Sequence, residues 1–192
     1  AACEDAAAVV ILLNDGSGAL TPAATLPVTD DARGVVAAQL VGDDALDLAV
    51  AVDNNTVRIL RNVNGAFVAG ASYVVGDRPE ALAAGDLNGD GHADLLTANR
   101  DSNTVSVLRN HGDGTFGPAT SHATGANPRA VLAADLNNDG AVDVATANHD
   151  SDDVSILWND GAGGLAAPIA IALSGQRRPL RLSTGDVDCD DD

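Results

Sequence analysis

The chain has 192 residues, of which 45% are apolar and 20% charged, and its formal net charge is −18. The length allows one domain with a sizeable core, and the apolar content excludes a disordered chain. The acidity and the lack of lysine exclude nucleic acid and anionic membrane surfaces as partners, and no apolar run approaches the roughly 20 residues of a membrane helix, so membrane insertion is not expected.

In chain order, the first feature is Cys3, which follows two alanines; lipoprotein anchoring at this cysteine stays open as an alternative. A short apolar segment that ends in asparagine then recurs four times at spacings of 48, 48 and 49 residues, with its asparagines at Asn14, Asn62, Asn110 and Asn159. A second marker is a proline seven residues before an aspartate, as in Pro79/Asp86, Pro128/Asp135 and Pro179/Asp186. Two independent markers with one period indicate a repeat protein.

Within each period the apolar pattern predicts strands. Residues 57–60 and 105–108 begin as apolar and polar alternation rich in β-branched side chains, and residues 94–98 and 143–147 are short apolar runs typical of strands buried on both faces. Residues 130–135 have helical propensity, but the segment is too short and follows a proline, so we expect a strand there. Turns are expected at 111–114 and 159–161. Four short antiparallel strands per period predict an all-β fold of β-propeller blades.

An acidic loop occurs twice with matching positions. Oxygen-bearing side chains stand at positions 1, 3, 5 and 9, with glycine at position 6, in Asp86, Asn88, Asp90 and Asp94 and again in Asp135, Asn137, Asp139 and Asp143. Hard oxygen donors at this spacing favour Ca²⁺. An EF-hand would need glutamate at position 12, where the chain has Thr97 and Thr146, and it would need flanking helices. The sequence therefore predicts calcium loops between strands.

These repeats resemble the FG-GAP/VCBS family, whose naming pattern is approached by Phe116-Gly117 followed by Gly125-Ala-Asn-Pro128. The resemblance implies a β-propeller with a calcium loop between the first and second strands of each blade. It implies two ligand sets that include the backbone carbonyls of His92 and Ala141 beside the oxygen donors just given. A third loop begins with Asp186, Asp188 and Asp190 and stops at position 7, and the loop at 39–47 has lost its ligands at positions 1 and 3.

The chain is predicted to be a single repeat domain, 1–192, with approximate repeats 1–38, 39–85, 86–134 and 135–185 and the start of a further loop at 186–192. Seven blades are usual in the family, so we expect an open arc of a larger propeller, whose bare sheet edges could self-associate. The alternative is a closed ring of four blades, in which Cys3 and Cys189 would lie in one shared blade and could form a disulfide.

The sequence shows no nucleophile with a base partner and no phosphate-binding loop, so an enzyme is not expected. The leading interpretation is a calcium-binding module, secreted, periplasmic or at the cell surface, that recognises or adheres to an extracellular protein or glycan. A purely structural segment of a larger protein and an accessory propeller of an extracellular enzyme are the alternatives. Arginines at the starts of the innermost strands either neutralise nearby aspartates or form a ligand face for an anion or a sugar carboxylate: Arg33, Arg78, Arg129 and Arg178.

Overall fold

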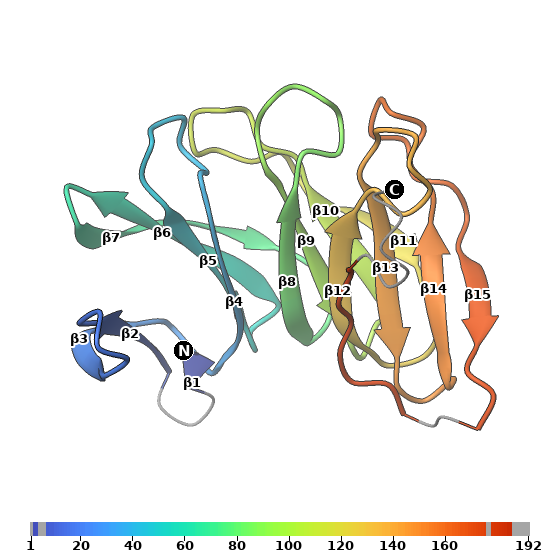
Figure 1. Cartoon of the computed structure of the whole chain (residues 1–192), viewed down its shortest axis with the longest axis horizontal. Coiled ribbons are helices and arrows are strands. Elements are labelled where there is room, and N and C mark those ends of the chain that lie inside the picture. The colour runs from blue at the N-terminus through green and yellow to red at the C-terminus, as the bar shows by residue number, and fades with distance from the viewer. Residues whose placement is uncertain (1, 4–6, 176–177, 186–192) are drawn as a thin grey trace.

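A computed structural model describes residues 2–3, 7–175 and 178–185 of the chain. These residues form 15 strands in four antiparallel sheets, and none of them is helical (Figure 1). No helix in this part of the chain could span a bilayer. The all-β prediction is confirmed.

Three sheets have four strands each, and in each sheet the strands follow one another in chain order. The first contains β4 (Ala32–Ala38), β5 (Asp47–Val52), β6 (Thr56–Val63) and β7 (Ala66–Val74). The second contains β8 (Pro79–Gly85), β9 (Asp94–Asn99), β10 (Thr104–Leu108) and β11 (Thr120–Ala123). The third contains β12 (Pro128–Ala134), β13 (Asp143–Asn148), β14 (Asp153–Leu157) and β15 (Ile169–Ala172). Each four-stranded meander is the expected blade, and it begins one strand before the corresponding sequence repeat.

The fourth sheet, at the N-terminal end, has three strands: β1 (Ala2–Cys3), β2 (Ala8–Asn14) and β3 (Leu20–Pro27). At the other end, residues 178–185 run beside β12 without forming a regular strand (Figure 1). The sheets form an open arc and do not close into a ring (Figure 1). The expected open arc is therefore confirmed over the closed ring, and the proposed partner of Cys3, Cys189, lies outside the described residues.

The second strand of each complete sheet is buried along its whole length, as the apolar runs predicted: every residue of β5, β9 and β13 is buried. Neighbouring sheets pack face to face through aliphatic side chains, because the chain has no methionine and few aromatic residues. The core between the second and third sheets shows this composition, with Leu87, Leu96, Val105, Val107, Val144 and Leu157. Burial of these side chains holds successive sheets together around a common axis.

Candidate metal centre

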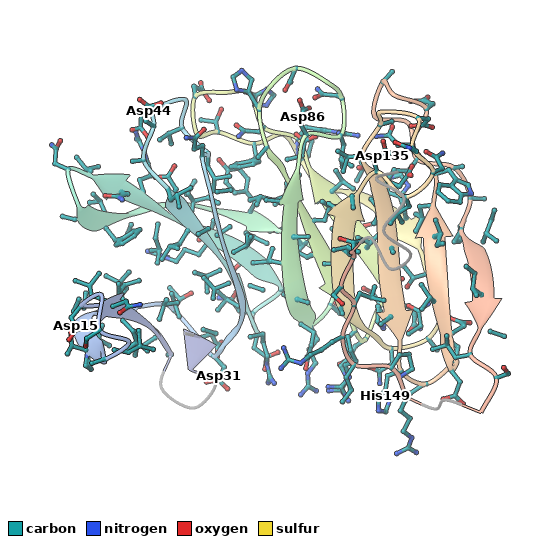
Figure 2. All side chains as sticks on the ribbon, in the orientation of Figure 1. Asp15, Asp31, Asp44, Asp86, Asp135 and His149 are labelled. Atoms are coloured by element: carbon teal, nitrogen blue, oxygen red, sulfur yellow. The ribbon has the colours of Figure 1, made fainter. Side chains whose placement is uncertain are left out.

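The two acidic loops connect the first and second strands of the second and third sheets, as the family resemblance implied. Figure 2 shows Asp86 and Asp135 along one edge of the arc, at the top of the view, where Asp44 of the loop at 39–47 also lies, while His149 lies at the opposite edge. The backbone leaves β8 and β12 and returns through β9 and β13 within eight residues, so each loop must turn sharply.

The loop that begins at Asp86 is curled around the carboxylate of that residue. The backbone N–H groups of Gly89 and Gly91 donate to Asp86 at 2.8 and 2.7 Å, and that of Asp90 donates at 3.2 Å. Gly91 has a φ of 85°, a conformation that favours glycine. The Asn88 amide donates to Asp90 Oδ2 at 2.9 Å. Positions 1, 3 and 5 therefore converge in one turn.

The loop that begins at Asp135 repeats this geometry. The Gly140 N–H donates to Asp135 Oδ2 at 2.8 Å, and the Asp139 N–H donates to Asp135 Oδ1 at 3.2 Å. The Asn137 amide donates to Asp139 Oδ2 at 2.9 Å. Gly140 has a φ of 87°. Two loops 49 residues apart in sequence thus place the same donors in the same arrangement.

Hydrogen bonds favour the ionised form of two loop carboxylates, Asp90 and Asp135. The Asn88 amide hydrogen bond lowers the pKa of Asp90 below its usual value, and the Gly140 backbone N–H does the same to the pKa of Asp135. Among the described residues, no arginine or histidine forms an ion pair with the side chains at positions 1 and 5 of either loop. Their negative charge is therefore stabilised mainly by hydrogen bonds within the loop, and at Asp90 the nearby charge of Arg109 adds a smaller contribution.

The carboxylates at position 9 have a different environment. Asp94 is fully buried and accepts hydrogen bonds from the backbone N–H groups of Asn110, at 2.8 Å, and Leu87, at 3.3 Å. Asp143 is also fully buried and accepts the same pair of bonds from Asn159 and Leu136. Both side chains therefore fasten the base of the loop to the start of the turn that follows the third strand.

The loop at 39–47 shows that the aspartate at position 9 makes these hydrogen bonds even in a loop without a complete set of metal ligands. Its last residue, Asp47, is fully buried and accepts bonds from Leu40 N at 3.2 Å and Asn62 N at 2.7 Å. Positions 1 and 3 of this loop are Gln39 and Val41, which supply no carboxylate. The aspartate at position 9 therefore has a structural role that is common to all three loops, a role that the sequence did not reveal.

The recurring asparagine, noted in the sequence only as a marker, joins adjacent sheets. The Asn159 amide donates to Val142 O of its own sheet at 2.8 Å and to Leu87 O of the preceding sheet at 2.7 Å. The Asn110 amide makes the equivalent bonds to Ala93 O and Leu40 O. Leu87 and Leu40, each the second residue of its loop, are thus hydrogen-bonded to the asparagine of the next sheet.

The donor chemistry at positions 1, 3 and 5 of both loops fits a calcium ion, since these positions bring two carboxylates and an amide together. The backbone at position 7 is drawn in as well, because the His92 and Ala141 N–H groups donate to Asp90 and Asp139. In the described part of the chain, no three His, Cys, Asp or Glu side chains form a group that could hold a metal ion. Asp186, Asp188 and Asp190 of the third loop lie outside the described residues.

The four arginines predicted as a ligand face do not form one site. Arg33 and Arg129 line a cavity on the axis side of the sheets. Arg78 instead lies between Asp53, at 4.0 Å, and Asp101, at 3.9 Å. Arg178 belongs to the linker before residues 179–185, where its backbone N–H donates to Asp152 Oδ1 at 2.8 Å. The cavity is also lined by Arg181, an arginine that no sequence pattern singled out.

A family model described as FG-GAP-like repeat matches the chain three times, over residues 40–97, 86–146 and 135–192. The matches together cover all three four-stranded sheets except β4 of the first one. A search of the curated proteins finds no match.

Several solved structures share the fold at low sequence identity. A protein from Lactobacillus plantarum is 20% identical with a TM-score of 0.69, and the match covers 91% of this chain and 51% of that one. A putative 6-phosphogluconolactonase from Bacteroides fragilis is 21% identical with a TM-score of 0.64, covering 91% and 49%. A lectin from Agrocybe aegerita that recognises non-reducing terminal N-acetylglucosamine is 22% identical with a TM-score of 0.54, covering 85% and 46%. The chain thus spans about half the length of these three structures.

Proposed function

The chain belongs to the FG-GAP-like repeat family, and from this we propose that it is a calcium-stabilised β-propeller module that recognises an extracellular glycan or protein. The observation that carries the calcium proposal is the pair of curled loops, whose carboxylates at positions 1 and 5 form no ion pair with an arginine or histidine of the described chain. A divalent cation held by Asp86, Asn88 and Asp90, and another held by Asp135, Asn137 and Asp139, would supply the missing positive charge.

The role of the ions would be structural. Each loop joins the first strand of its sheet to the second, and the loop that begins at Asp86 is also tied to the next sheet through Asn159 and Leu87 O. Fixing the loop therefore fixes the angle between neighbouring sheets. This would make the edge of the arc that carries the loops rigid. A rigid, preorganised surface loses less entropy when it binds a ligand.

Extracellular calcium modules bind with dissociation constants of about 10⁻⁴–10⁻³ M, which suits the millimolar calcium outside cells. We therefore propose a secreted, periplasmic or cell-surface location. The lectin among the similar structures supports a glycan as one class of ligand. Structures named as lactonases share the fold as well, so assays for recognition should be accompanied by an assay for sugar-lactone hydrolysis.

A glycan array and a protein pull-down, each performed with calcium and with a chelator, test the recognition role. We expect selective retention of a ligand in calcium and loss of that ligand in chelator. If calcium stabilises the chain but no ligand is retained, the alternative that the chain is a structural segment of a larger protein would be favoured. Lactone hydrolysis that is lost on substitution of one polar residue would establish an enzyme instead.

A further inference from the structure

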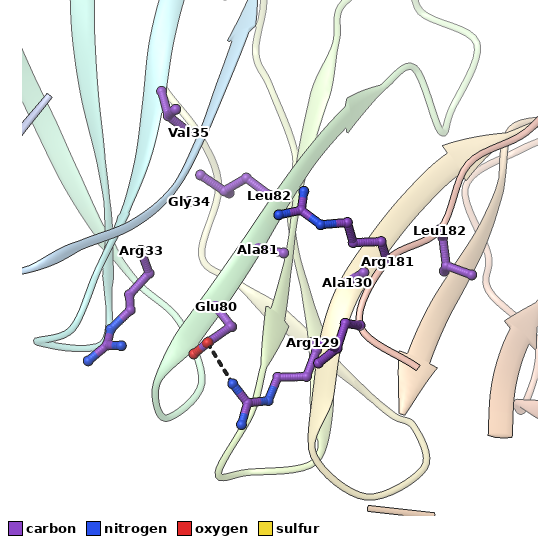
Figure 3. Close-up of a pocket in the computed structure, with 11 residues that line it drawn as sticks. Arg33, Gly34, Val35, Glu80, Ala81, Leu82, Arg129, Ala130, Arg181 and Leu182 are labelled. Carbon is purple, nitrogen blue, oxygen red and sulfur yellow. Dashed lines mark hydrogen bonds and ion pairs between the residues drawn. The ribbon is translucent and has the colours of Figure 1, made fainter. Parts of the chain in front are cut away.

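A cavity of about 460 Å³ lies on the axis side of the arc (Figure 3). Its walls are the innermost strands β4, β8 and β12, together with residues 180–182 of the C-terminal segment. Four charged side chains line it, namely Arg33, Glu80, Arg129 and Arg181. The volume is in the range of small-molecule binding sites.

The fold places three of these charges by one repeated device. The pairing of each innermost strand with the second strand of its sheet shifts register at the second residue: between Ala32 and Gly34, between Pro79 and Ala81, and between Pro128 and Ala130. The residues skipped by the ladder are Arg33, Glu80 and Arg129. A bulge frees a side chain from the alternation of the strand and re-aims it, so successive sheets present a charge at the same height along the axis.

The charges in the cavity do not balance. Arg129 Nη1 lies 2.9 Å from Glu80 Oε1, and Arg33 Nη2 lies 2.8 Å from Asp53 Oδ2. Arg181, from the C-terminal segment, points towards β8 in Figure 3, and no hydrogen bond or ion pair joins it to another described residue. Three guanidinium groups and one carboxylate thus line the cavity, in a chain whose net charge is −18.

The cavity also has an unused acceptor. Glu80 Oε2 is buried and accepts no hydrogen bond from the described residues, while Oε1 of the same carboxylate is held by Arg129. A buried carboxylate oxygen without a donor is costly, so a turn of the Glu80 side chain that brings Oε2 to a hydrogen-bond donor of a bound molecule is favoured. Val35, Leu82, Leu180 and Leu182 add apolar surface to the same walls.

We propose that this axial cavity binds an acidic sugar, with the carboxylate of a hexuronate held by Arg181 and a ring hydroxyl donated to Glu80. Planar guanidinium groups match carboxylates in two parallel hydrogen bonds. Sulfate, which has no O–H group, would satisfy the arginine but would leave the Glu80 acceptor unpaired, whereas a polyhydroxylated carboxylate satisfies both. The aliphatic walls suit the C–H faces of a sugar ring. This inference rests on the recognition role proposed above and names its ligand.

Binding of digalacturonate to the whole chain, measured by isothermal titration calorimetry in calcium, tests the proposal. The disaccharide of galactose with the same linkage and inorganic sulfate are the comparison ligands. We expect digalacturonate to bind, the neutral disaccharide not to bind, and Arg181→Ala to weaken binding at least about tenfold, the loss expected for a charge-assisted pair. Glu80→Gln should also weaken binding. The control Arg61→Ala removes an exposed arginine of β6 and should have no effect.

The proposal is overturned if digalacturonate does not bind, if sulfate binds as well as digalacturonate, or if Arg181→Ala binds like the unmodified chain. Melting temperatures of all variants establish that they are folded. A neutral glycan or a protein that binds with calcium but ignores Arg181→Ala and Glu80→Gln would keep the recognition role and remove the axial site. The two proposals therefore fail in different ways.

Discussion

Arg109 donates a hydrogen bond to the buried carboxylate of Asp94, with Nη1 2.5 Å from Oδ2, and its second terminal nitrogen donates to the carbonyl of Gly163 in the next sheet. The positive charge of Arg109 also lowers the pKa of Asp90 in the loop. In the third sheet the corresponding residue, before the recurring asparagine, is Trp158. The loop that begins at Asp86 therefore has a built-in cation, and the loop that begins at Asp135 does not.

This difference predicts unequal calcium affinities. In Arg109→Trp, calcium should bind the loop at 86–94 about three- to tenfold more tightly, because a repelling charge near the ion is removed. The reciprocal Trp158→Arg should weaken the loop at 135–143 by a similar factor. Calorimetric titration of each swap, with the other loop disabled by Asp139→Ala or Asp90→Ala, separates the two sites. Identical affinities in swapped and unswapped chains would refute the role of Arg109.

Substitution of Asp47, at position 9 of the loop at 39–47, tests the structural role of the aspartate at this position. In Asp47→Ala, the backbone N–H groups of Leu40 and Asn62 lose their acceptor in the interior, which should lower the free energy of unfolding by about 2–4 kcal/mol. Because this loop lacks the ligands at positions 1 and 3, the loss should be the same in calcium and in chelator. Urea unfolding under both conditions measures it, and a loss confined to calcium would mean that Asp47 acts through a metal.

The recurring asparagine should matter most where it joins two sheets. Asn159→Ala leaves the carbonyls of Leu87 and Val142 without the amide, and we expect a loss of about 1–3 kcal/mol in unfolding free energy. Asn14 is the matched control, since it is exposed and its side-chain oxygen accepts a bond from Gly16 within its own turn. Asn14→Ala should cost less than about 0.5 kcal/mol. Equal losses in the two variants would contradict the inter-sheet role.

Gly125, in the linker between the second and third sheets, is predicted to resist substitution. A Cβ at this position would lie 2.4 Å from Ser151 Oγ and 2.6 Å from Asn148 Nδ2. Both atoms are held by hydrogen bonds, so they cannot move freely. Gly125→Ala should lower the melting temperature through overpacking worth about 1–3 kcal/mol. Gly185→Ala, which meets nothing within 4 Å, is the control, and similar melting temperatures for both variants would show that the linker is adaptable.

The sequence predicted the fold well because its repeat carries the information that a blade needs. The spacing of Asn62, Asn110 and Asn159 placed the third strands, and the apolar runs placed β9 and β13. The contacts of those asparagines could not be predicted, because they join residues about 70 positions apart, such as Asn159 and Leu87.

The site was predicted in part, for a related reason. The curled ligand loops follow from local spacing, whereas the hydrogen bonds of Asp94 depend on a turn in another part of the sheet. Arg78 and Arg178 were predicted near the axis because they stand at the starts of the innermost strands, but both have positive φ in linkers and lie away from the cavity. Arg181 was missed because it stands one residue beyond the position of Arg129 in the period.

The melting temperature in 1 mM calcium, compared with that in chelator, shows whether calcium bound by the two loops stabilises the fold. With dissociation constants of about 10⁻⁴–10⁻³ M, each site contributes about 0.4–1.4 kcal/mol, so chelation should lower the melting temperature by a few degrees. Asp90→Ala and Asp139→Ala should each remove part of the response, with the larger part lost in Asp139→Ala because its loop lacks an arginine. A melting temperature that is the same in calcium and chelator would contradict the account.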